Sequence, residues 1–302
     1  MMSLPFAIAD NVSAALAAGR PVAALESTLI AHGLPWPVNF ETARASDDAV
    51  RQAGAAPATI AVWQGVPTIG LSLAQIEDLA QSKSAVKASR RDLAAAIARG
   101  QTAATTVAAT MFLAHRAGIR VMATGGIGGV HKEASDSFDI SADLVELART
   151  PVAVVCSGAK SILDLAKTLE LLETLAVPVI GYRTSEFPAF YERSRGMPIP
   201  CRADSAEEIA RIMRCHWELQ GGGLIIAQAV PEEAALSNEE FAAALEVAEA
   251  GVDGLTGPAV TPALLANLAE ATQGRSLNAN RALIVANARL AGEIAKYWSN
   301  TV

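Results

Sequence analysis

The stretch VAVVCSGAKSILDLAKTLELLETL, residues 152–175, contains the two elements that decide the fold. Its first part, 152–158, is apolar on both faces of a strand, and its second part, 161–175, repeats apolar residues at helical spacing. Strands that are apolar on both faces are typical of a sheet covered by helices. The stretch therefore predicts a strand–turn–helix unit of an α/β fold, with the turn SGAK between the two elements.

The same alternation recurs along the chain and extends this interpretation to a whole sheet. The expected strands cover residues 22–28, 58–65, 119–126, 152–158, 178–183 and 223–229. The expected helices include residues 105–118, 161–175 and 205–220, and the chain beyond about residue 238 reads as helical, ending in 276–298. The pattern predicts a mostly parallel sheet covered by helices. Residues 62–72 leave no room for a helix between two strands, so we expect a hairpin that makes the sheet mixed.

Composition restricts the class of protein. The chain has 302 residues, 51% hydrophobic and 18% charged, with a net charge of -7. An acidic chain does not hold nucleic acid polymers by general electrostatics. The three cysteines form no CxxC pair, no apolar stretch is long enough for a membrane span, and the N-terminus lacks the basic region of a signal peptide. We expect one domain over residues 1–302 in a globular, cytoplasmic protein that binds no membrane.

Polar residues follow the predicted strands where each strand ends. They are residues 26–28, 124–126, 157–160 and 183–184. In open α/β sheets, ligands lie outside the carboxyl ends of the strands. We therefore expect all four groups to converge on one cleft.

Glu26 and Lys160 are the expected reactive groups of this cleft. Glu26 lies in an apolar strand, and burial raises the pKa of a carboxyl group toward the range of a general acid or base. Lys160 is expected at the start of a helix, where a desolvated lysine loses its proton more easily and becomes an amine nucleophile for carbonyl substrates. The alternatives are a solvated strand-end glutamate and a lysine that reaches into solvent.

Two further segments carry groups suited to binding. The segment after TGGIGGV contains His131, Asp136, Asp139 and Asp143, and carboxylates without cysteine suit a hard cation. The alternative is that Asp139 or Ser141 caps the helix that follows and that Asp143 stabilises its first turn. Residues 86–100 are expected to place Lys87, Ser89, Arg90 and Arg91 at the start of a helix, which suits phosphate unless the arginines are solvated or paired with Asp92.

Six blocks together resemble one known family. They are ALESTLIAHGLPWP (24–37), VKASRRDL (86–93), TTVAATMFLAHRAGIRVMATGGIGGVHK (105–132), DISADL (139–144), VCSGAKSILD (155–164) and SLNANRALIVANARLAG (276–292). In this order and at these spacings they are similar to the pseudouridine-5'-phosphate glycosidase family, also called indigoidine-synthase-A-like. The resemblance implies an α/β/α sandwich around a mixed sheet, a homotrimer, and a Mn²⁺-dependent, reversible cleavage of pseudouridine 5'-phosphate to uracil and ribose 5-phosphate.

The resemblance also assigns roles by motif. It implies that Glu26 is the proton donor, that Lys160 is the nucleophile that forms an imine with the opened ribose, and that Asp139 holds the manganese. The implied substrate contacts are Lys87, Val107, Ser141, Ala142 and Asp143, with Thr124, His131 and Asn280 as further members of the site.

Three alternatives remain open at this point. The pocket can suit another C- or N-ribosyl phosphate, because its shape selects the base. A Schiff-base aldolase on a phosphorylated sugar would also use Lys160, and a ribose-phosphate sensor would keep the fold without turnover. A nucleotide panel and borohydride trapping on Lys160 separate these cases.

Overall fold

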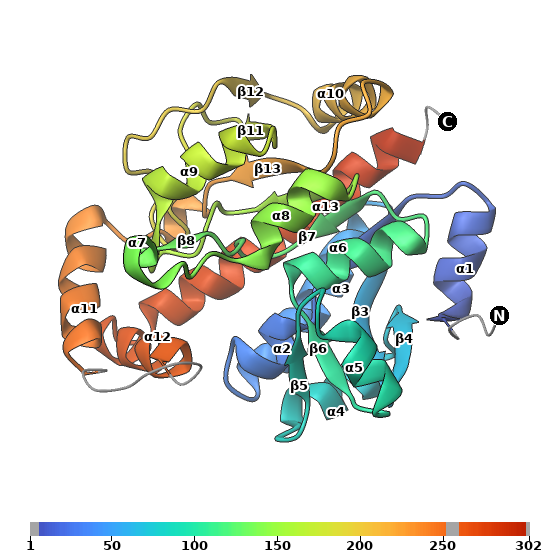
Figure 1. Cartoon of the computed structure of the whole chain (residues 1–302), viewed down its shortest axis with the longest axis horizontal. Coiled ribbons are helices and arrows are strands. Elements are labelled where there is room, and N and C mark those ends of the chain that lie inside the picture. The colour runs from blue at the N-terminus through green and yellow to red at the C-terminus, as the bar shows by residue number, and fades with distance from the viewer. Residues whose placement is uncertain (1–5, 252–259, 300–302) are drawn as a thin grey trace.

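The computed structural model describes residues 6–251 and 260–299 (Figure 1). Residues 1–5, 252–259 and 300–302 lie outside the described residues, and so do the parts of the predictions that cover them. The strands are β1 (Ala7–Ile8), β2 (Val22–Leu25), β3 (Ala56–Trp63), β4 (Val66–Ile69), β5 (Val86–Ala88), β6 (Ala103–Thr105), β7 (Val121–Ala123), β8 (Val130–His131), β9 (Ala153–Cys156), β10 (Leu163–Asp164), β11 (Val179–Tyr182), β12 (Cys201–Ala203) and β13 (Leu224–Gln228).

The helices alternate with these strands in the first three quarters of the chain and then follow one another. They are α1 (Asp10–Ala17), α2 (Thr28–His32), α3 (Val38–Gln52), α4 (Leu73–Gln81), α5 (Leu93–Ala98), α6 (Val107–Arg116), α7 (Ala134–Ser137), α8 (Ala142–Arg149), α9 (Leu165–Thr174), α10 (Ala206–Glu218), α11 (Asn238–Ala250), α12 (Val260–Ala271) and α13 (Arg275–Ser299), with a 3₁₀ turn at Glu232–Ala234.

The main sheet is mostly parallel and mixed, as predicted. Its strand order is β1-β4-β3-β2-β7-β9-β13-β11-β12, and β6 pairs with both β3 and β5. The six predicted strands are all present as β2, β3, β7, β9, β11 and β13. β3 is shifted two residues toward the N-terminus, and the other five are shorter than expected. The antiparallel pairs of β3 with β4 and with β6 make the sheet mixed. The turn of the predicted hairpin consists of Gln64 and Gly65, both with positive φ.

Helices cover the two faces of the sheet and bury its strands (Figure 1). The long helix α13 packs with α3 and α10 against β2, β7 and β9, whereas α6 and α8 pack together on the opposite face. This arrangement buries β2 and β9 along their whole length. The fold is therefore the α/β/α sandwich expected from the sequence, while the prediction of a single domain stays a prediction.

Two sequence predictions about local structure are wrong, and both concern lysines. Lys87 does not start a helix, because residues 86–88 form β5 beside β6 and the helix begins only at Leu93. Lys160 does not start one either, since α9 begins at Leu165 after the short strand β10. Neither lysine therefore owes its environment to the N-terminus of the helix that follows it.

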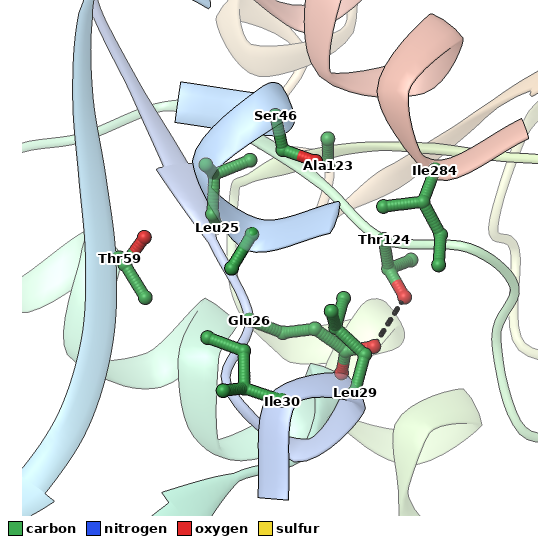
Figure 2. Close-up of a pocket in the computed structure, with 10 residues that line it drawn as sticks. Leu25, Glu26, Leu29, Ile30, Ser46, Thr59, Ala123, Thr124 and Ile284 are labelled. Atoms are coloured by element: carbon green, nitrogen blue, oxygen red, sulfur yellow. Dashed lines mark hydrogen bonds between the residues drawn. The ribbon is translucent and has the colours of Figure 1, made fainter. Parts of the chain in front are cut away.

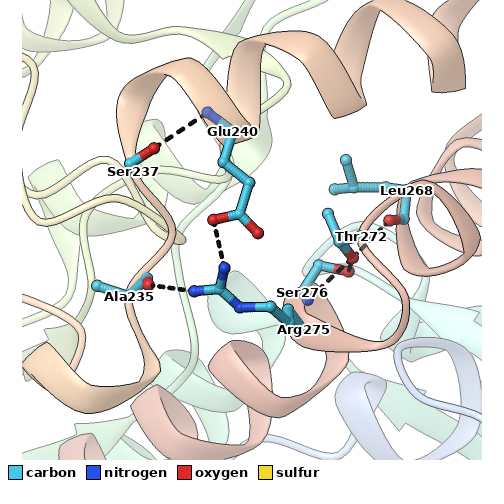
Figure 3. Close-up of polar contacts among 7 residues, drawn as sticks. All are labelled: Ala235, Ser237, Glu240, Leu268, Thr272, Arg275 and Ser276. Carbon is cyan, nitrogen blue, oxygen red and sulfur yellow. Dashed lines mark hydrogen bonds and ion pairs between the residues drawn. The ribbon is translucent and has the colours of Figure 1, made fainter.

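The start of α13 is tied to α11 by polar contacts (Figure 3). The Arg275 guanidinium forms a 2.6 Å ion pair with Glu240 and donates a hydrogen bond to the carbonyl of Ala235 at 3.1 Å. Ser237 caps α11, and Thr272 donates to Ser276 at 3.0 Å. These contacts fix the first turn of the helix that carries two asparagines to the site. None of the described helices has the length and the apolar run that a membrane crossing needs.

Candidate active site

Glu26 lies at the carboxyl end of β2 and is buried, as predicted. Only 6% of it is exposed. Its Oε1 accepts a 2.6 Å hydrogen bond from Thr124 Oγ1, which follows β7, the neighbouring strand (Figure 2). Leu29 and Ile30 of α2 and Ile284 of α13 surround the pair, beside a cavity of about 10 Å³ that is at the lower limit for one water molecule. Glu26 is thus buried and held by the Thr124 hydroxyl, with these apolar side chains on one side of it.

Charges around Glu26 link it to three other predicted residues. Burial raises the pKa of Glu26, opposed mainly by the positive charge of Lys160 and by the Thr124 hydrogen bond. Partial burial lowers the pKa of Lys87, and the charge of Lys160 lowers it further, whereas Glu26 and Asp143 oppose this shift. Because Lys160 and Asp143 both act on Glu26 and on Lys87, and these two act on each other, the four residues form one cluster of charges. The structure brings these four predicted residues together.

The turn that carries Lys160 is bound to the glycine-rich turn after β7. Ser157 N–H donates to the carbonyl of Gly125 at 2.9 Å, Ile127 N–H donates to that of Gly158 at 3.0 Å, and Lys160 N–H donates to that of Ile127 at 3.1 Å. Gly158 has a φ of +81°, a value that a glycine adopts without strain. The backbone of this turn therefore fixes where the Lys160 side chain begins.

Asp143 joins two helix N-termini. Its Oδ1 accepts from Ala108 N–H in the first turn of α6 at 2.9 Å, and its Oδ2 accepts from Gly128 N–H at 2.8 Å. Ser141 caps α8, because its hydroxyl accepts from Asp143 N–H at 3.3 Å. Val107 and Ala142 are the first residues of α6 and α8. The predicted set of Val107, Ser141, Ala142 and Asp143 thus lies where two helices present N–H groups, a setting that suits an anion.

His131, at the end of β8, and Asp139, on the loop between α7 and α8, lie beside each other. His131 Nε2 is 3.7 Å from Asp139 Oδ2, and both side chains are open to solvent. The described residues contain no group of three or more His, Cys, Asp or Glu side chains arranged to hold a metal. Asp136 contacts Ser135 instead. An exposed carboxylate with one imidazole neighbour fits a hard divalent ion that keeps most of its water ligands.

The predicted convergence of all four strand ends is wrong for one group. Arg183 and Thr184 follow β11 and line a separate hollow with Arg193 and Gln228.

The side chain of Arg91 is exposed beside Asp92, and that of Arg90 lies over the Phe112 ring, 3.7 Å from Glu146. The side chains of Arg90 and Arg91 are thus paired or solvated, which was the alternative to a phosphate site.

Asn280 lies above the glycine-rich turn. It lines a hollow of about 420 Å³ with residues of α2 and α12, and its Oδ1 would be 3.6 Å from a Cβ added at Gly125.

His32 lines the same hollow and was not predicted. Burial and the charge of Lys87 lower the pKa of His32, and contacts with the carbonyls of Val86 and Ala85 oppose this shift. Its position inside the block ALESTLIAHGLPWP (24–37), six residues after Glu26, was the available signal.

Asn287 was missed entirely, although it touches both turns of the site. Its Nδ2 donates to the carbonyl of Thr124 at 2.9 Å and lies 3.2 Å from Ser157 Oγ. The residue is fully buried in α13. An asparagine at a helix position that otherwise faces the core was the available signal, because a buried amide costs free energy unless it is hydrogen-bonded.

The fold and the cluster define a class of protein: an α/β/α sandwich with a lysine, a buried carboxyl group and the N-termini of two helices at the carboxyl edge of its sheet. The family model "Indigoidine synthase A like protein" matches residues 11–297, and the chain belongs to this family.

Named relatives cover nearly the whole chain. It is 54% identical over 299 residues to pseudouridine-5'-phosphate glycosidase of Jannaschia sp. (strain CCS1), covering 98% of this chain and 99% of the relative. It is 52% identical to that of Caldanaerobacter subterraneus subsp. tengcongensis, covering 95% of each. Among solved structures, the prealnumycin C-glycosynthase AlnA in complex with ribulose 5-phosphate has a TM-score of 0.91 at 41% identity, covering 99% of this chain and 98% of that one. An indigoidine synthase A (IdgA)-like protein of Thermotoga maritima has a TM-score of 0.89 at 36% identity, with the same coverage.

Proposed function

We propose that this protein is a pseudouridine-5'-phosphate glycosidase that cleaves the C-C glycosidic bond of its substrate to give uracil and ribose 5-phosphate. The observation that carries the proposal is the single cluster of Glu26, Lys160 and Lys87 at the carboxyl edge of the sheet. The relatives named for this activity support it, because they match the chain from end to end. An amine and a protonated carboxyl group in one pocket are what cleavage of a carbon–carbon bond through an imine requires.

Lys160 and Glu26 each have a step in the proposed reaction. The Lys160 amine attacks C1', a C1'–N bond forms as the C1'–O4' bond breaks and the ribose ring opens, and a proton passes from the nitrogen to O4'. Glu26 then gives a proton to C5 of uracil, and the C1'–C5 electron pair stays with the base while the nitrogen lone pair forms the imine. Water adds to C1', the C1'–N bond breaks to release ribose 5-phosphate and the free amine, and the proton that water gives up returns to the Glu26 carboxylate. The raised pKa of Glu26 favours the protonated form that this step needs.

The phosphate of the substrate fits the helix N-termini beside Lys87. The first turns of α6 and α8 meet there through Asp143, and Ser141 adds a hydroxyl. N–H groups at helix ends and a nearby ammonium stabilise a phosphate dianion. Asp143 already accepts two backbone N–H groups, so in this proposal it orients the two helix ends.

Manganese belongs to the proposal through Asp139. Asp139 would hold one hydrated Mn²⁺ with His131 beside it, and an ion there would supply a positive charge that orders water and substrate. The homotrimer stays a prediction from the family resemblance, and the cytoplasmic location stays a prediction from the composition and the N-terminus. Size-exclusion chromatography with light scattering tests the trimer.

The deciding experiment incubates the protein with pseudouridine 5'-phosphate and Mn²⁺ and follows free uracil. Lys160→Ala is expected to abolish release, and borohydride is expected to trap ribose 5-phosphate on the wild type but not on Lys160→Ala. Lys167→Ala is the matched control, because this nearby lysine pairs with Asp164 on the surface. Trapping without uracil release would favour the aldolase alternative, and the absence of both would favour a sensor.

Reversal of the reaction is a second activity to measure. The name of AlnA describes a C-glycosynthase, so that protein forms the type of bond that this one is proposed to break. Because the reaction is reversible in principle, uracil and ribose 5-phosphate together are expected to yield pseudouridine 5'-phosphate. Failure of synthesis alongside active cleavage would show that the equilibrium lies on the side of cleavage under the conditions used.

A further inference from the structure

Asn287 lies inside the core without an evident contribution to stability. It is 0% exposed, in the middle of α13, where its neighbours along the helix are apolar core residues such as Ala288, Leu290 and Ala291. Asparagine forms helices less readily than leucine or alanine, and its amide loses water on burial. An apolar residue at this position would fill the core but would leave the Thr124 carbonyl and the Ser157 hydroxyl without these hydrogen bonds. The side chain is therefore retained for the hydrogen bonds that it makes.

Those hydrogen bonds reach two separate turns of the site. On one side, Nδ2 donates to the carbonyl of Thr124 at 2.9 Å and approaches that of Gly125 at 3.4 Å. On the other, the amide pairs with Ser157 Oγ, which lies 3.2 Å from Nδ2 and 3.4 Å from Oδ1. Thr124 is the residue whose hydroxyl binds Glu26, and Ser157 opens the turn that carries Lys160. One side chain thus connects the partner of the carboxyl group with the support of the amine.

We infer that Asn287 is a positioning residue that holds the Thr124 turn and the Ser157 turn at a fixed separation, so that Glu26 and Lys160 act on the same substrate. The inference rests on the proposed function for its kinetic consequences, although the contacts themselves do not depend on it. Asn287 touches neither substrate nor reacting atoms in this role. Its effect passes through Thr124 to Glu26 and through Ser157 to Lys160.

The test uses Asn287→Asp, which keeps the shape and replaces the donor Nδ2 by an oxygen facing two carbonyl oxygens. We expect kcat for uracil release to fall by about 100-fold with little change in KM, because misplacement by about 1 Å has an effect of this size. Asn267→Asp is the matched control, since Asn267 also donates Nδ2 to a backbone carbonyl, that of Ala248 at 3.3 Å, between α11 and α12. It is expected to keep the wild-type kcat.

A second measurement is independent of turnover. The Thr124 hydrogen bond lowers the pKa of Glu26, so loosening Thr124 is expected to raise the pKa of Glu26 further. Side-chain ¹³C NMR of Glu26 follows this titration in the wild type and in both asparagine variants. If the wild type releases no uracil, the proposed function fails, but the titration still decides the role of Asn287. An unchanged titration in folded Asn287→Asp would overturn the inference.

Ser157→Ala covers the case in which Asn287→Asp does not fold. This variant removes the hydroxyl link to Asn287 and leaves the contact with Thr124 intact. We expect a smaller loss of kcat than in Asn287→Asp and an unchanged Glu26 titration, because only the Lys160 side is released. A wild-type kcat in Ser157→Ala, with wild-type uracil release intact, would show that the link does not position Lys160.

Discussion

Substitution of Gly158 by alanine is expected to misplace Lys160. Gly158 has a φ of +81°, and an added Cβ would lie about 1 Å inside the 3.0 Å that real Cβ atoms keep from a neighbour, here the Pro188 carbonyl oxygen. Backbone atoms cannot yield as a flexible side chain does, so the turn itself must shift by about that distance. The left-handed conformation costs a further roughly 1–2 kcal/mol for a residue with a Cβ. Since Lys160 follows two residues later, we expect kcat to fall by about 100-fold.

Gly118→Ala separates the clash from the backbone strain. Gly118 has a φ of +85° but nothing lies within 4 Å of an added Cβ. We expect both variants to lose about the same free energy of unfolding from strain, while only Gly158→Ala loses more stability and most of its uracil release. Steady-state kinetics and denaturant unfolding measure the two effects. Equal kcat values for the two folded variants would refute the view that the Gly158 turn sets the position of Lys160.

Three further predictions concern carboxyl groups of the site. Glu26→Gln is expected to abolish uracil release yet to raise the free energy of unfolding above pH 4.5. The reason is that the pKa of Glu26 is raised in the folded state, so the wild type loses stability as the pH rises from the unfolded-state pKa of 4.5 through the folded-state pKa. Urea unfolding at several pH values measures this effect, and a variant less stable than the wild type above pH 4.5 would contradict it. Asp143→Asn is expected to cost about 1–3 kcal/mol, since an amide satisfies only one of the two N–H groups that Asp143 accepts, and unchanged urea unfolding would exclude this role. Asp139→Ala is expected to remove Mn²⁺ binding in isothermal titration calorimetry without a change in thermal stability, because the side chain is exposed, and retained binding would place the metal elsewhere.

The sheet could be predicted because its strands carry their own signal. β2, β9 and β13 are apolar on both faces, and only burial between helix layers accounts for such runs. The hairpin was predictable because the two strand-like runs meet at Gly65, and so short a connection allows only an antiparallel pair. The burial of Glu26 followed from the same reasoning, since a carboxyl group at the end of an apolar strand shares the environment of that strand. These features depend on residues that are close in the sequence.

The errors arise where distant residues decide the local structure. The helical periodicity of the sequence begins at residue 161, but Leu163 and Asp164 pair with β8 as a short strand, so the helix begins after them. Asp164 then caps α9 by accepting from Lys167 N–H at 3.0 Å, a signal that was present in the sequence and passed over. Lys87 is in a strand because β6 pairs beside it. The partners of Asn287 lie 130 and 163 positions away, so no local pattern predicts them.

Lys87 can act in one of two ways: it binds the substrate phosphate, or it changes the protonation of Lys160 and Glu26. Lys87 lies near the N-termini of α6 and α8 in the proposed site, but its pKa also responds to Lys160 and Glu26. A charge-assisted hydrogen bond to phosphate is worth about 1.5–3 kcal/mol. Since 1.4 kcal/mol corresponds to a factor of ten, Lys87→Ala is expected to lower kcat/KM for pseudouridine 5'-phosphate by about 10- to 150-fold. Pseudouridine itself has no phosphate to lose contact with, so its slower cleavage is expected to stay unchanged in the variant. An equal loss on both substrates would mean that Lys87 acts through Lys160 or Glu26, and the phosphate would then have to be held by the helix ends and Ser141.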